Sequence, residues 1–249
     1  MPDRRTLRAE MWIVLWLSIA AAALRSLLSL VDSLTRGEPL SGQSTTLVGT
    51  FIADRPWLDV LFQAAHIALP LVPVLLVVHL LRRSGEGPRA IGLDLRDWPR
   101  DLGRGAVLAA VIGGIGLVFY LIAFNLGLNV RIAAVTADPH WWTPILLVAS
   151  AAYNAVLEEV IVLAYFVHRA RQIGWAPWAQ IGSSALLRGA YHLYQGFGGF
   201  LGNLAMGAVF AWLYRRWGRV MPFLLAHLFI DSTAFLGYYY LGGHVSWLP

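Results

Sequence analysis

Residues 105–128 read GAVLAAVIGGIGLVFYLIAFNLGL and contain no charged side chain. A helix needs about 20 consecutive apolar residues to cross the hydrocarbon core of a membrane, and this stretch exceeds that length. Lipid offers no hydrogen-bond partner to an unpaired backbone, so a stretch of this kind has to be helical. Residues 105–128 therefore predict a membrane-spanning helix, and the segments on either side repeat the pattern.

About seven apolar segments follow one another along the 249 residues. The chain is 58% hydrophobic and only 13% charged, which makes it more apolar than an ordinary soluble domain. The first segment lacks a cleavage site of small residues, so we expect it to be retained rather than removed as a signal peptide. The fifth and sixth segments are short, and we expect them to be bent or shielded inside the bundle. The segments are Met11–Val31, Trp57–Leu81, Gly105–Leu128, Ile145–Val167, Trp178–Tyr194, Phe200–Tyr214 and Val220–Leu241.

These segments predict an all-α fold, a polytopic transmembrane helix bundle that forms one domain over residues 1–249 and lies in the cell membrane. All nineteen basic residues are arginines, and cytoplasmic loops retain positive charge during insertion. Fourteen arginines fall on one side of the predicted membrane, so we expect the N-terminus inside. Because they are spread over separate loops, the expected partners are membrane lipids and not nucleic acid. The inner arginines are Arg4, Arg5, Arg8, Arg82, Arg83, Arg89, Arg96, Arg100, Arg104, Arg169, Arg171, Arg215, Arg216 and Arg219; the outer ones are Arg36, Arg55 and Arg131.

Ionisable side chains inside the predicted helices indicate where chemistry takes place, because such groups are costly in lipid and usually face the bundle interior. The chain has no cysteine, so a site has to use His, Asp, Glu, Asn and Arg. A lone histidine such as His66 is more often an interhelical hydrogen-bond partner. Three helices of the second half carry a denser set, namely Glu158 and Glu159, Arg188 and His192, and His227 and Asp231.

The spacing of these residues favours one shared cavity. Arg188 and His192 are four residues apart, as are His227 and Asp231, so each pair lies on one helix face. Glu158 and Glu159 are adjacent and point about 100° apart around a helix, so they need different roles. A glutamate beside a histidine can take a proton from water, and the remaining groups can stabilise an oxyanion, directly or through a metal. This set is typical of a hydrolase.

Three motifs in this region resemble those of the CPBP (CAAX protease and bacteriocin-processing, or Abi) intramembrane proteases. Residues 158–163 (EEVIVL), 188–192 (RGAYH) and 227–231 (HLFID) are similar, in order, to the family patterns EExxxR, FxxxH and HxxxN/D. The resemblance covers residues 145–241, which would form the catalytic half. Each motif alone is weak, but the three in order on successive membrane helices are fairly specific.

The resemblance implies a role for each residue. Glu158 would be the general base that activates water together with His192, and Glu159 would support the site. His227 and Asp231 would bind the oxyanion or a metal. A zinc ion, if one is used, would take its ligands from His192, His227, Asp231 and Glu158, whereas a metal-free site built from the same groups is an equal alternative.

Two positions depart from the family pattern. Leu163 stands where the family has arginine, and Arg188 stands where it has phenylalanine. We hypothesise that Arg188 supplies, from a neighbouring helix, the positive charge missing at position 163, and that it pairs with Glu159.

The predicted function is therefore an intramembrane endopeptidase that cuts membrane-associated peptides or lipidated proteins, such as CAAX-type tails. Two other classes stay open. Buried Glu, His and Asp residues also form proton relays in ion-coupled transporters. The missing arginine at position 163 is also compatible with a non-catalytic immunity or scaffold protein.

Overall fold

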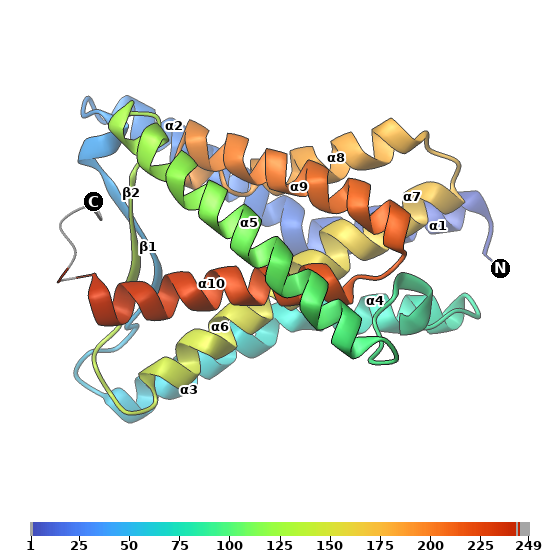
Figure 1. Cartoon of the computed structure of the whole chain (residues 1–249), viewed down its shortest axis with the longest axis horizontal. Coiled ribbons are helices and arrows are strands. Elements are labelled where there is room, and N and C mark those ends of the chain that lie inside the picture. Colours follow the sequence, from blue (N-terminus) through green and yellow to red (C-terminus); the bar gives the residue numbers. More distant parts are fainter. Residues whose placement is uncertain (1, 243, 245–249) are drawn as a thin grey trace.

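The computed structural model describes residues 2–242 and 244 and shows a bundle of long helices (Figure 1). Within these residues, six helical segments are long and apolar enough to cross a membrane. Three of these segments each consist of two shorter α-helices that follow one another in one continuous apolar stretch. The six are Arg4–Thr35 (α1 Arg4–Leu15 and α2 Ala21–Thr35), Pro56–Arg83 (α3 Pro56–Ala68 and α4 Val72–Arg83), α5 Trp98–Asn125, Thr143–Gln172 (α6 Thr143–Glu158 and α7 Phe166–Gln172), α9 Phe197–Trp217 and α10 Met221–Leu241.

The fifth predicted segment corresponds to α8, which runs from Pro177–Ala190 and is too short to span a membrane. Its buried face is polar, because Gln180, Ser184 and Arg188 follow one another at intervals of four residues. The Ser184 hydroxyl donates to the carbonyl of Val162 at 2.8 Å. Helix α8 therefore turns its polar face toward the middle of the bundle. The predicted shielding holds for this face only, because Trp178 and Leu186 on the other side of the helix are exposed.

A two-stranded parallel sheet, which the sequence analysis did not predict, joins two loops of the bundle. Strand β1 (Ser44–Gly49) pairs with β2 (Arg131–Thr136) in the register Ser44↔Arg131 to Gly49↔Thr136. The sheet lies at the end of the bundle away from the N-terminus (Figure 1). The bundle is otherwise helical, as expected.

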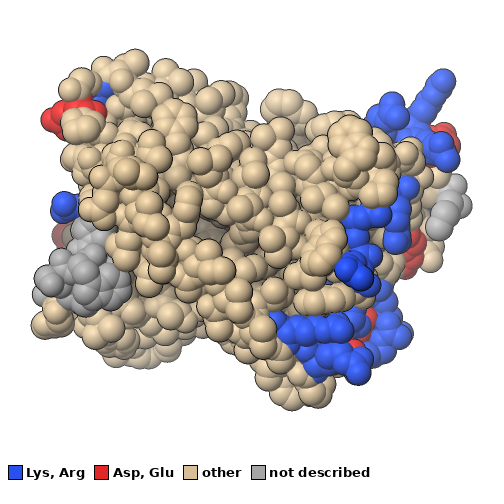
Figure 2. Space-filling model, turned by 45° about the horizontal axis from the view of Figure 1, so that its top comes forward, with Lys and Arg blue, Asp and Glu red and all other residues tan. Residues whose placement is uncertain are grey.

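The predicted inner arginines gather at the opposite end of the molecule (Figure 2). Ion pairs tie their loops together: Arg83 binds Glu10, and Arg169 binds Glu86 with a nitrogen–oxygen distance of 2.6 Å. Burial opposes ionisation of Glu86, but hydrogen bonds from His168 and Arg169 outweigh it and lower the pKa of Glu86. This clustering at one end agrees with the arginine alternation from which the orientation was predicted.

The turn between α9 and α10 is held by the loop that precedes α5 and by the first turn of α5. Arg219 donates to Asp101 at 2.6 Å and to Asp94 at 3.2 Å, and the guanidiniums of Arg96 and Arg219 keep the pKa of Asp94 below its ordinary value. Gly92 lies directly against this turn, since a β-carbon there would be 2.2 Å from the α-carbon of Arg219. Because α10 carries His227 and Asp231, these contacts set where the last motif enters the bundle.

We expect Gly92→Ala to destabilise the protein more than Gly85→Ala. Both glycines have positive φ, 68° at Gly92 and 76° at Gly85, but nothing lies within 4 Å of a β-carbon at Gly85. The control should therefore show only the backbone cost of about 1–2 kcal/mol. Thermal unfolding in detergent measures the difference. Equal melting temperatures for the two variants would contradict the proposed role of the Gly92–Arg219 contact.

Candidate active site

The two glutamates lie where α6 changes its helical geometry. Helix α6 ends at Glu158, and residues Glu159–Tyr165 continue as a π-helix before α7 begins. Short π-helical segments are rare and occur frequently at functional sites. Glu159 is completely buried, whereas the side chain of Glu158 stays 13% exposed. The adjacent carboxylates therefore differ in their access to solvent, in line with the different roles expected for them.

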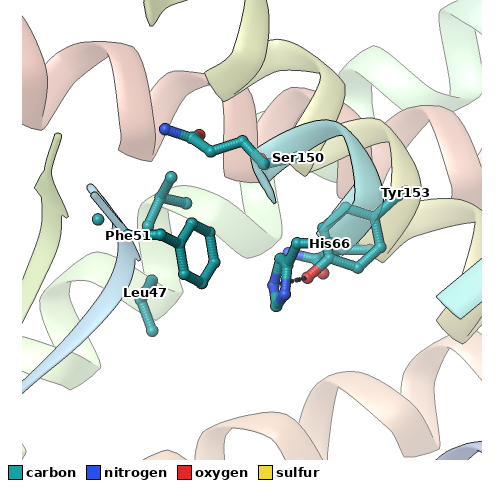
Figure 3. Close-up of a pocket in the computed structure, with 9 residues that line it drawn as sticks. Leu47, Phe51, His66, Ser150 and Tyr153 are labelled. Carbon is teal, nitrogen blue, oxygen red and sulfur yellow. Dashed lines mark hydrogen bonds between the residues drawn. The ribbon is translucent and has the colours of Figure 1, made fainter. Parts of the chain in front are cut away.

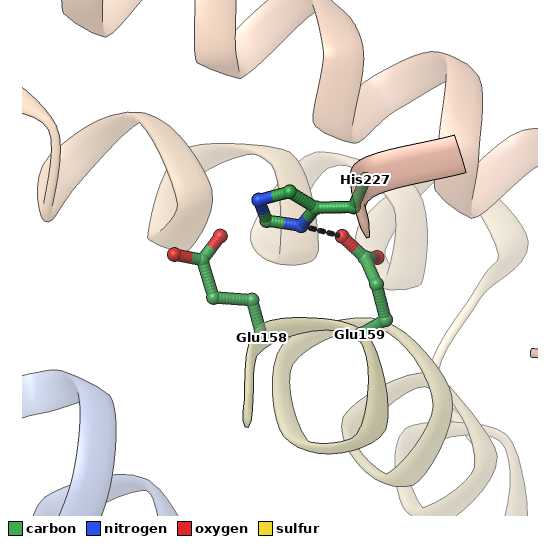
Figure 4. A group of neighbouring side chains, drawn as sticks. All are labelled: Glu158, Glu159 and His227. Carbon is green, nitrogen blue, oxygen red and sulfur yellow. Dashed lines mark hydrogen bonds and ion pairs between the residues drawn. The ribbon is translucent and has the colours of Figure 1, made fainter. Parts of the chain in front are cut away.

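Glu159 is held by two cationic or hydrogen-bonding partners from other helices. Arg188 of α8 donates to Glu159 Oε1, and His227 Nδ1 of α10 lies 2.7 Å from the same oxygen (Figure 4). The pairing of Arg188 with Glu159 that we hypothesised from the sequence is thus present. A buried carboxylate without such partners would be strongly destabilising. Glu159 consequently joins the π-helical segment that follows α6 to α8 and α10 at one point.

Space for the Arg188 side chain is made by α9. Gly207 has no side chain at this contact, and a β-carbon there would be 3.1 Å from Arg188 Cδ and 3.0 Å from the α-carbon of Ala185. The ring of Phe210 lies 5.4 Å from the guanidinium carbon, within the range of a cation–π contact. Leu163, where the family has arginine, is buried in the hydrophobic core instead. The charge of this site therefore comes from α8 and not from the helix that carries the glutamates.

Glu158 has a partner that the sequence analysis did not assign to the site. The Tyr191 hydroxyl donates to Glu158 Oε2 at 2.7 Å, and Arg188 NH1 lies 3.8 Å from the same oxygen. Tyr191 immediately follows α8 and is buried, although tyrosine near a helix end is more often an interfacial anchor. Its position before His192 was the only available signal. Glu158 Oε2 is thus engaged, and the solvent-accessible part of the side chain is the part that can meet water.

His227 lies between two carboxylates. Its Nδ1 faces Glu159, and its Nε2 is 3.4 Å from Asp231 Oδ2, four residues further along α10. Asp231 also accepts a hydrogen bond of 3.4 Å from the Asn154 amide on α6. An imidazole donates from both nitrogens only when it is protonated. The arrangement therefore suits a His227 that carries positive charge beside the glutamates.

His192 contributes in a different way. Its Nδ1 is 2.9 Å from the carbonyl of Arg188, and a carbonyl only accepts, so Nδ1 carries a proton. A neutral ring then leaves Nε2 as an acceptor. The ring lies beside Tyr191 and Tyr194, with centroid distances of 4.6 and 6.3 Å. Among the described contacts, no hydrogen bond joins His192 to Glu158. The two residues predicted to activate water together are therefore not in direct contact in this arrangement.

A possible metal site is formed by Glu158, Glu159 and His227, whose donor atoms lie within 4.8 Å of one another. Their oxygen and nitrogen donors are of the kind that zinc binds. Glu159 Oε2 is buried and makes no hydrogen bond within the described part of the chain, which leaves a lone pair for a cation. The set fits a divalent metal, but it differs from the predicted one because Glu159 takes part while His192 and Asp231 lie outside the three-residue group.

We expect Arg188→Leu to destabilise the fold strongly, by about 3–5 kcal/mol, because it leaves the Glu159 carboxylate buried without its cation. Glu159→Gln should be similarly costly, and the double variant should lose much less than the sum of the two. Chemical denaturation in detergent measures the cycle, with the exposed Arg36→Leu as the control that changes little. Additive losses would show that the two residues do not stabilise each other.

Comparison with protein families supports the resemblance found in the motifs. Residues 140–233 match the family described as type II CAAX prenyl endopeptidase Rce1-like. This segment contains all six of the predicted site residues. No curated protein and no solved structure gave a match.

Proposed function

We propose that the chain is an intramembrane endopeptidase that hydrolyses peptide bonds of membrane-associated substrates, of the CAAX-tail type or similar. The observation that carries this proposal is the pair of adjacent carboxylates, one sealed in an ion-paired network and the other exposed at its edge. The match of residues 140–233 to the CAAX endopeptidase family and the six membrane-spanning segments support it.

In the proposed reaction Glu158 is the general base. Tyr191 fixes one carboxylate oxygen, and the other accepts a proton from a water molecule as the hydroxyl oxygen bonds to the carbon of the scissile carbonyl. The tetrahedral oxyanion then collapses, the carbon–nitrogen bond breaks, and the proton held by Glu158 passes to the leaving amine. Glu158 thereby ends the cycle as it began, as a carboxylate.

Stabilisation of the oxyanion is assigned to His227. Its two nitrogens face Glu159 and Asp231, which favour a positive charge on the ring, and that charge would attract the developing anion. His192, whose Nε2 is an acceptor, can orient the attacking water together with Glu158 once substrate is bound, since catalytic hydrogen bonds often tighten only in the substrate complex. Arg188 acts through Glu159 and does not contact the reacting atoms, so it is a positioning residue.

A divalent metal, if bound, would be held by Glu158, Glu159 and His227 and would polarise the scissile carbonyl or lower the pKa of a bound water. The Arg188 guanidinium, which already pairs with Glu159, opposes a second cation at this place. The same residues therefore support both a metal-assisted and a metal-free site, and the two are separable by experiment.

We expect Glu158→Gln to abolish cleavage of a membrane-tethered, prenylated peptide while the protein stays folded. Glutamine keeps the shape of the side chain and can still accept from Tyr191, but it cannot take a proton from water. Glu38→Gln, in an exposed loop, is the matched control and should cut at the wild-type rate. Cleavage by purified protein in liposomes is the measurement, and full activity of Glu158→Gln would exclude Glu158 as the base.

The metal dependence follows from the donor set and is tested on the same preparation. If Glu158, Glu159 and His227 hold zinc, purified protein should contain about one zinc per chain and lose activity to a chelator. Glu159→Gln should then lower the zinc content. Full activity after complete removal of metal, measured by mass spectrometry, would establish the metal-free reaction.

A further inference from the structure

A second group of polar residues lines a small cavity on the sheet side of the glutamates (Figure 3). We call it the Tyr153 cavity. It has a volume of about 40 Å³. In Figure 3 the ring of His66 from α3 faces Tyr153 from α6, and Phe51 lies beside them. The lining residues are Leu47, Val48, Gly49, Phe51, Gln63, His66, Ser150, Tyr153 and Asn154.

Polar side chains inside membrane helices need hydrogen-bond partners other than lipid. His66 is exposed and its Nε2 lies 3.3 Å from the Tyr153 hydroxyl, which confirms the interhelical hydrogen bond expected of it. Gln63, Ser150 and Asn154 also line the cavity, and lipid tails cannot satisfy a polar group that is left without a protein partner. A cavity of this volume has room for about two or three water molecules, and it offers each the polar contacts that an ordered water needs.

One face of α6 leads from the lining of the cavity to the proposed active site. Ser150, Asn154 and Glu158 are spaced by four residues, so they lie on the same helix face over about 12 Å. Asn154 belongs to both places, because it lines the cavity and also donates to Asp231, the partner of His227. The other α6 positions near the cavity are apolar, for example Ala151, which is fully buried.

The outer wall of the cavity is fixed in place by a buried aspartate. Asp59 of α3 accepts hydrogen bonds from the backbone amides of Phe51 and Ile52, at 2.6 and 3.0 Å, and from Gln63 at 2.7 Å. These bonds hold the loop between β1 and α3 over the cavity, with the Phe51 ring 5.4 Å from the His66 ring. This wall therefore consists of the loop that follows β1, and the cavity lies next to the sheet end of the bundle.

We propose that the Tyr153 cavity is a water-filled vestibule through which water reaches Glu158 from the sheet end of the bundle. Only the use of this water, as the nucleophile of peptide hydrolysis, rests on the proposed function. The hydration of the vestibule follows from its polar lining at membrane depth.

The test is reaction of single cysteines with a small, charged thiol reagent in liposomes that contain both orientations of the protein. The chain has no cysteine of its own, so every signal comes from the introduced residue. His66→Cys lies in the vestibule. Leu61→Cys is the matched control on the same helix, five residues nearer to the sheet end; Leu61 is exposed, as His66 is, but it does not line the vestibule.

We expect His66→Cys to react at least about tenfold faster than Leu61→Cys, because the thiolate attacks the reagent and apolar surroundings suppress thiolate formation. Ser150→Cys, a nearly isosteric change inside the vestibule, should also react, while Ala151→Cys should not. If Leu61→Cys reacts as fast as or faster than His66→Cys and Ser150→Cys stays unmodified, the cavity is dry and the inference is wrong.

The same labelling separates this inference from the proposed function. In the Glu158→Gln background the labelling of Ser150→Cys should be unchanged, since it reports hydration and not catalysis. If the vestibule cysteines are labelled but the protein cleaves no peptide, the water-filled vestibule is supported and the proposed protease function is contradicted. If the protein cleaves peptides but the vestibule cysteines do not react, the protease function is supported and the vestibule is contradicted.

Discussion

The buried contact of Glu159 with Arg188 and His227 is the interaction on which the arrangement of the three motifs depends. It joins the π-helical segment that continues α6 to α8 and α10, and Glu159 is fully buried there. A carboxylate that is completely removed from solvent is tolerable only while both partners remain. The position of each of the three motifs is therefore coupled to that of the other two.

This coupling explains how adjacent glutamates acquire different chemistry. Glu159 is already saturated on one oxygen by cationic or hydrogen-bonding partners, so it is a structural anion. Glu158 receives only the Tyr191 hydroxyl and a distant guanidinium, and it keeps some exposure. The general base of the proposed reaction has to be accessible to water, and of the two glutamates Glu158 is the partly exposed one. The change from α-helix to π-helix falls between these two glutamates, since the π-helix starts at Glu159.

Much of the fold was predictable because its signals are local. Long apolar stretches and the alternation of arginines can be read directly along the sequence, and they located the spans and the arginine-rich end. The pairing of Arg188 with Glu159 was also predictable, since a charge missing at position 163 had to be supplied from elsewhere. In contrast, the parallel pairing of β1 with β2 joins loops far apart in the sequence and leaves no periodic signal. The contact of Tyr191 with Glu158 depends on how α8 ends, which no spacing rule gives.

The position of the arginine has a physical consequence for the site. An arginine on the same helix as Glu159 would position that carboxylate without involving α8, whereas Arg188 makes the site depend on the packing of α8 against α9. Gly207 and Phe210 of α9 contact the Arg188 side chain, so the packing of α9 helps to fix the charge beside Glu159. The buried polar face of α8 follows from the same arrangement, because the face of a short helix that carries a buried cation has to contact protein and not lipid. Leucine at position 163 is therefore compatible with an intact anionic site, provided that α8 and α9 stay packed as they are here.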